Sequence, residues 1–138
     1  MLFLNFYSVS MIIGTTFYAL VSLFIFFAIP EKSRATKHLG FSLLFAGLLA
    51  FAYIPAHLIY HPLAAYHRWL TVPAALLTHP HYAQVLYHFP DTRYKKTALF
   101  ILIFQYVLMF VITGLFIYIS SSRELTYNFA SHLWDIDA

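Results

Sequence analysis

Residues Val9–Ile29 read VSMIIGTTFYALVSLFIFFAI, an apolar run without a single charged side chain. At 1.5 Å per residue, a helix of this length reaches about 31 Å, which matches the hydrocarbon core of a bilayer. Pro30 ends the run. No Lys or Arg stands within residues 1–30, so the basic start of a cleaved signal peptide is missing. The stretch therefore predicts a retained membrane-spanning α-helix.

Three further apolar stretches follow, at about residues 39–60, 69–89 and 97–119. The whole chain is 62% hydrophobic and only 9% charged, whereas globular proteins carry about 25% charged residues. So few charges do not suffice to build a water-facing surface. The composition predicts an all-α integral membrane protein in one domain, residues 1–138, with four transmembrane helices. The lipid bilayer is its expected partner, and nucleic acid is not.

The loops between these stretches differ in their content of Lys and Arg. Loops one and three hold Lys32, Arg34, Lys37, Arg93, Lys95 and Lys96, whereas loop two and the tail hold only Arg68 and Arg123. Basic loops remain in the cytoplasm. Both termini are therefore expected outside a bacterial inner membrane, with residues 120–138 as an extracytoplasmic tail.

This orientation predicts the outcome of reporter fusions. Fusions after Arg34 and Arg93 are expected to read cytoplasmic, because these residues stand in the basic loops. Fusions after His67 and at Ala138 are expected to read extracytoplasmic. A cytoplasmic reading at Ala138 would contradict the topology.

Histidine is unusually frequent, with eight residues, and cysteine is absent. His57 and His61 are four residues apart, so on a helix they share one face at the predicted outer end. His67, Arg68 and Trp69 follow in the outer loop and at the start of the third helix. These five are candidate ligand-binding residues. A metal site of converging imidazoles and a simple anchor in the interfacial belt remain the alternatives.

Four polar side chains are expected inside the membrane: His79, His81, His88 and Gln105. His81 and His88 lie seven residues apart on one helix face, as a proton relay or haem ligands would require. Packing and hydrogen bonding between helices is the simpler interpretation, also for His79 and Gln105. Neither haem nor stoichiometric metal is expected in the purified protein, and no set of residues forms a catalytic constellation.

Four stretches carry a resemblance to a known group of proteins: Ser33–Gly40, Tyr60–Val72, His88–Asp91 and His132–Ala138. They resemble the N-terminal multi-pass membrane regions of bacterial signalling proteins, of the type found in spirochaetes. Those proteins carry a cytoplasmic adenylate/guanylate cyclase, serine phosphatase or histidine kinase domain. The similarity covers about residues 30–138 and implies a sensory or anchoring module. It implies no catalytic residue in this chain.

The expected function is thus that of a non-catalytic sensor or anchor. Four helices that begin outside also end outside, so a cytoplasmic output domain needs an odd number of further spans. The chain is expected to form the first four helices of a seven-helix bundle, or to associate with copies of itself or other subunits. An accessory subunit of a respiratory or transport complex is one alternative, and a histidine-ligated metal or haem protein is another. Because imidazole titrates near neutrality, external pH is a candidate stimulus.

Overall fold

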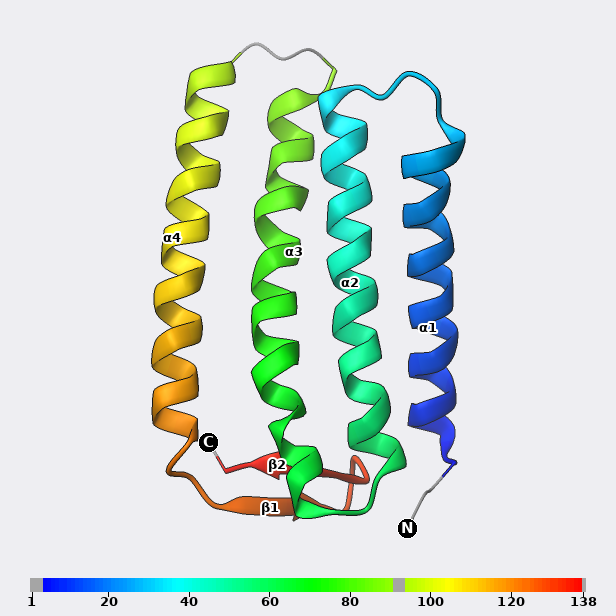
Figure 1. Cartoon of the computed structure of the whole chain (residues 1–138), viewed down its shortest axis with the longest axis vertical. Helices are drawn as coiled ribbons and strands as arrows, with labels where there is room; N and C mark the ends of the chain where they lie inside the picture. Colours follow the sequence, from blue (N-terminus) through cyan, green and yellow to red (C-terminus); the bar gives the residue numbers. More distant parts are fainter. Residues whose placement is uncertain (1–3, 91–93, 138) are drawn as a thin grey trace.

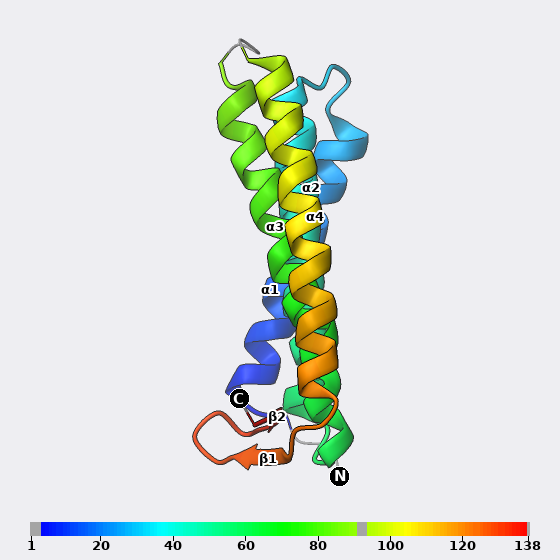
Figure 2. The same cartoon turned by 90° about the vertical axis from the view of Figure 1, so that its left-hand side faces the viewer.

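A computed structural model describes residues 4–90 and 94–137. Long helices run up and down in sequence order and stand side by side in a row (Figure 1). They are α1 (Phe6–Leu23, continued by a π-helical turn over Phe24–Ala28), α2 (Arg34–Leu58), α3 (Arg68–His88) and α4 (Lys95–Ser120). Each packs mainly on its neighbour in sequence, and Figure 2 shows the row from its side. The outer helices α1 and α4 therefore form the two edges.

The architecture confirms the predicted helical fold, and its apolar helices support a membrane protein, but four spans are not confirmed. Three helical segments are long and apolar enough to cross a membrane: Phe6–Ala28, Arg34–Leu58 and Lys95–Ser120. Helix α3 is 21 residues long but does not reach this degree of apolarity. Its sequence explains the difference, because it contains two prolines and three histidines between Arg68 and His88.

Local sequence signals explain where the helices begin. Asn5 and Ser8 form a capping box at the start of α1: the Asn5 side chain accepts from Ser8 N at 2.8 Å, and Ser8 Oγ accepts from Asn5 N at 3.0 Å. At the start of α2, Ser33 Oγ accepts from Thr36 N at 3.1 Å. Each cap pairs backbone N–H groups that a helix leaves without internal partners.

Small residues bring α1 and α2 into close contact. A Cβ atom added to Gly47 would lie 3.2 Å from Cβ of Tyr18, and one added to Gly40 would lie 2.9 Å from the Phe26 ring. Ser22 Oγ also donates to the Gly40 carbonyl at 3.0 Å. Close backbone approach at small residues is how helices associate where lipid removes the hydrophobic driving force.

The interface between α3 and α4 is the smallest of the three helix interfaces. Three side-chain hydrogen bonds, spread along its length, hold it together. The pairs are Trp69–Ser120, Tyr106–His81 and Gln84–Ala98, with donor–acceptor distances of 3.0, 2.7 and 2.9 Å. Because the interface is small, these three hydrogen bonds are a large share of its contacts.

Two of the polar residues expected inside the membrane differ from the expected bonding between helices. His79 is exposed, and its Nδ1 lies 2.8 Å from the Ala75 carbonyl of its own helix, so within the described residues it makes no bond across an interface. On α4, Gln105 Oε1 and Thr113 Oγ1 are buried but have no hydrogen-bond partner within the described residues.

The tail after α4 forms a β-hairpin that the sequence analysis did not predict. Strands β1 (Leu125–Asn128) and β2 (Leu133–Ile136) pair antiparallel. The hairpin lies across the end of the row (Figure 1) and packs on the 3₁₀-helical segment Pro62–His67. Leu133 and Ile136 are buried there, so the hairpin closes this end of the molecule, which is called the hairpin end below.

Candidate functional site

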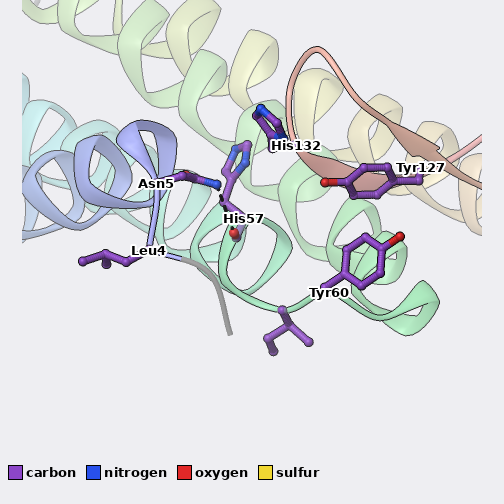
Figure 3. Close-up of a pocket in the computed structure, with 7 residues that line it drawn as sticks. Leu4, Asn5, His57, Tyr60, Tyr127 and His132 are labelled. Atoms are coloured by element: carbon purple, nitrogen blue, oxygen red, sulfur yellow. Dashed lines mark hydrogen bonds between the residues drawn. The ribbon is translucent and has the colours of Figure 1, made fainter. Parts of the chain in front are cut away.

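A cavity of about 220 Å³ lies at the hairpin end, where three distant parts of the chain meet. The start of α1, the end of α2 and the hairpin each contribute to its wall. The lining residues are Leu4, Asn5, His57, Ile59, Tyr60, Tyr127 and His132. Figure 3 shows Asn5, His57 and His132 on one side and Tyr60 and Tyr127 on the other. The cavity thus combines aromatic walls with several polar groups, as small-ligand sites do.

His57 is the most constrained polar residue of this cavity. Its ring is buried and stacks on Tyr7, with ring centroids 5.4 Å apart. Asn5 Nδ2 donates to the His57 carbonyl at 3.4 Å and thereby ties α1 to α2. His57 Nδ1 has no hydrogen-bond partner within the part of the chain that the structure describes. A buried imidazole nitrogen beside a cavity is available to a ligand.

The five predicted ligand-binding residues do not form one site. Only His57 lines the cavity described above. His61 and His67 line a separate cavity of about 340 Å³ beside Pro55. His61 Nδ1 accepts from Leu63 N at 3.2 Å and caps the 3₁₀ segment, and Trp69 donates to Ser120. Helix α2 ends at Leu58 and His61, before Pro62, is extended, so the two histidines do not share the helix face that an uninterrupted helix would give them.

Arg68 pairs with the hairpin, and the pair lines a further cavity of about 380 Å³ between α3, α4 and the hairpin. Its Nε donates to Asp135 Oδ1 at 2.6 Å, and its Nη2 donates to Asp135 Oδ2. Burial acts to raise the pKa of Asp135, but the hydrogen bonds and charge of Arg68 outweigh it, so this pKa lies below its ordinary value. The carboxylate therefore stays ionised and holds β2 to the start of α3.

His67 lies beneath the hairpin and is buried. Its Nδ1 lies 2.9 Å from the Ala64 carbonyl, and its ring contacts Tyr53 with centroids 5.0 Å apart. Burial is the main cause that lowers the pKa of His67. The carbonyl bond and Asp135 act in the opposite direction but do not overcome burial.

This lowered pKa predicts that the hairpin end loosens in mild acid. A base whose pKa is lower in the folded state stabilises folding fully above its unfolded value, about 6.5, and less as pH falls below it. Amide exchange of the Pro62–His67 segment, corrected for its intrinsic pH dependence, should therefore rise below about pH 6.5. In His67→Gln, amide exchange of this segment should increase less as the pH falls. In His61→Gln, the increase with falling pH should be the same as in the unmodified chain. An equal rise in both variants would exclude His67 as the cause.

A second cluster of histidines joins three helices near the other end of the row. His38 Nδ1 and His81 Nδ1 lie 2.9 Å apart, and Tyr106 Oη lies 2.7 Å from His81 Nε2. His88 stacks on His38 with ring centroids 5.4 Å apart. If Tyr106 donates to His81, then His81 donates to His38, and the reverse direction is equally consistent. The cluster is thus a continuous hydrogen-bonded chain from α4 through α3 to α2.

His38, His132 and Tyr127 are the residues that sequence reasoning missed. His38 and His132 fall outside the predicted spans, and this placement hid their contacts. The alternation of apolar and polar residues over 125–128 was a usable signal for the first strand, whereas residues 133–136 do not alternate. No group of three or more His, Asp or Glu side chains in the described ranges is arranged to hold a metal ion.

Comparison with protein-family models, with curated proteins and with solved structures found no match. The fold and composition therefore define the class by themselves. The chain is a helical membrane protein with three segments apolar enough to span a bilayer and a β-hairpin at one end.

Proposed function

We propose that this chain is a non-catalytic sensory or anchoring module of a bacterial membrane signalling protein. One observation carries the sensory role: the cavity at the hairpin end is walled by the start of α1, the end of α2 and the hairpin. An occupant that fits one arrangement of these three parts better than another shifts the balance between them. To convert a mostly inactive population into a mostly active one, the ligand must bind the active arrangement more tightly by about 5 kcal/mol of binding free energy.

Helix α2 connects this cavity to the opposite end of the molecule. His57 lines the cavity, and His38 belongs to the histidine cluster, 19 positions earlier in the same helix. These positions are about 28 Å apart along a helix axis. A displacement of α2 at the cavity therefore reaches α3 and α4 through the His38–His81 bond. Pro55 interrupts the hydrogen bonds of α2 beside the cavity, where a helix bends most easily.

The proposal also covers the orientation of the chain in the membrane and the further helices that would complete the bundle. All four helices span the bacterial inner membrane, with both termini outside, as the placement of the basic residues favours. Helix α4 stands at one edge of the row, and most of its large apolar side chains are exposed. Its outer face is therefore open to a neighbouring helix. Further helices or a second copy of the chain would supply it.

Reporter output tests the sensory role directly. The chain is joined through one further transmembrane helix to a cytoplasmic enzyme, and activity is measured between about pH 5 and pH 8 and with small polar ligands. Activity is expected to change with at least one condition. His57→Gln should weaken that response severalfold, because it alters the buried wall of the cavity. His61→Gln, at the same end but outside this cavity, should respond as the unmodified chain does.

Two results would count against sensing. If activity never varies, while deletion of the helices only releases the enzyme from the membrane, the chain is an anchor. If His57→Gln and His61→Gln both respond normally, the cavity at the hairpin end is not the sensory site.

A further inference from the structure

Another cavity, also of about 220 Å³, lies at the end of the row opposite the hairpin. It is formed where α2 begins, α3 ends and α4 begins. The lining residues are Arg34, Gln84, His88, Lys95, Lys96, Leu99 and Leu102. Three permanent cations therefore line this basic cavity, and none of its lining residues is a carboxylate.

Within the described residues, no ion pair neutralises the positive charge of the basic cavity. The ion pair found within the described residues is Arg68–Asp135, at the hairpin end. Arg34, Lys95 and Lys96 form none in the ranges 4–90 and 94–137. Like charges gathered in one cavity repel each other, and an anion placed between them removes that repulsion.

Polar atoms in the same place also lack partners. His88 is only 7% exposed, and its Nδ1 has no hydrogen-bond partner in the described chain. The side chain of Tyr94, the residue that precedes α4, makes no hydrogen bond to the first N–H groups of that helix. A helix start carries a partial positive charge and binds phosphate oxygens through such groups. A buried imidazole, which can donate from Nδ1, and a helix start thus complement the three cations.

The remaining wall of the basic cavity is apolar. Leu99 and Leu102 follow the two lysines along α4, and Leu99 is 57% exposed. α4 is among the helices apolar enough to cross a membrane. The cavity is therefore polar toward the helix ends and apolar along the helix, which matches an amphiphile with an anionic head and an acyl chain.

We propose that the basic cavity binds the phosphate group of an anionic phospholipid. Arg34, Lys95 and Lys96 pair with the phosphate, His88 donates to it, and an acyl chain lies along Leu99 and Leu102. Basic cavities between transmembrane helices bind anionic headgroups for the same physical reasons. This site does not depend on the sensory role, and it holds whichever side of the membrane the cavity faces.

Lipid retention measured by native mass spectrometry tests the proposal. The detergent-purified chain is titrated with phosphatidylglycerol and, separately, with phosphatidylcholine. Phosphatidylglycerol is expected to bind more tightly. Lys95→Gln combined with Lys96→Gln should weaken its retention about tenfold or more. Both lysines are exposed, so this variant should fold, and Arg34→Gln provides an independent second variant.

The matched control removes the same charge nearby. Lys32→Gln combined with Lys37→Gln alters two cations at the same end that do not line the basic cavity. Retention should remain within about twofold. Equal losses in control and test variants would overturn the proposal, since only net charge would then matter. Displacement of the lipid by millimolar inorganic phosphate would identify a site for free phosphate and overturn the assignment to lipid. Equal binding of both lipids would also overturn it.

Discussion

Replacement of Asp135 with asparagine is expected to release the hairpin from the helices. The carboxylate accepts two hydrogen bonds from the Arg68 guanidinium, whose side chain is only 35% exposed. An asparagine leaves this partly buried cation without a counter-charge. Hydrogen bonds to charged groups contribute about 1.5–3 kcal/mol, and docking of the hairpin should weaken by about 2 kcal/mol. Amide exchange in β2 should rise about 30-fold.

Asp137→Asn is the matched control, because it removes the same charge two residues further on. Asp137 is exposed and makes no ion pair with the described residues. Its replacement should change exchange in β2 little. Similar exchange in the two variants would show that the Arg68–Asp135 pair does not hold the hairpin.

The pH dependence separates this pair from His67. The pKa of Asp135 lies below its ordinary value, so the carboxylate stabilises docking fully above about pH 4 and loses this effect only as pH falls further. The stabilisation of docking by neutral, buried His67 is instead lost as the pH falls below about 6.5. Loosening between about pH 6.5 and pH 5 should therefore persist in Asp135→Asn and vanish in His67→Gln.

Gly47→Leu is expected to separate α1 from α2. Even a Cβ at this position would lie 3.2 Å from Cβ of Tyr18 and 3.7 Å from the backbone N of Ala19. The rest of a leucine side chain has no space without moving one helix. Overpacking costs about 1–3 kcal/mol, and the tie from Asn5 to the end of α2 should be lost with it. Unfolding by a denaturing detergent measures the loss of stability.

Gly114→Leu controls for the general effect of leucine in a helix. Nothing lies within 4 Å of a Cβ added to Gly114. The gain in helix propensity is the same at both positions and therefore cancels in the comparison. Stability should change by less than about 0.5 kcal/mol. If both variants unfold alike, close approach at Gly47 does not hold α1 to α2.

The helices could be predicted because lipid imposes a simple rule on sequence. Hydrocarbon requires long runs of apolar residues, and the predicted runs differ from the observed helices by only a few residues at each end. Pro30 and the charged loops supplied the remaining boundaries. The arrangement of the helices in a row carries no comparable signal, because every face of an apolar helix is acceptable to lipid.

The sites were less predictable because they depend on pairings between distant residues. Arg68 was considered with its neighbours in sequence, but its partner Asp135 lies 67 positions away. His38 gained its role only when α2 packed against α3 and brought it to His81. His57 lines a cavity because the end of α2 lies beside the start of α1 and the hairpin. Sequence neighbours share a helix face, whereas cavities are shaped by several segments together.

The row of helices also determines how force passes through the molecule. In a closed bundle each helix touches two neighbours, and a push on one is shared between parallel routes. Here a displacement of α4 can reach α1 by two routes: through α3 and then α2, or through the hairpin, which follows α4 and packs on the end of α2 and on Pro62–His67. The first route crosses the smallest helix interface, that between α3 and α4. The hairpin therefore couples the two edges of the row at one end only.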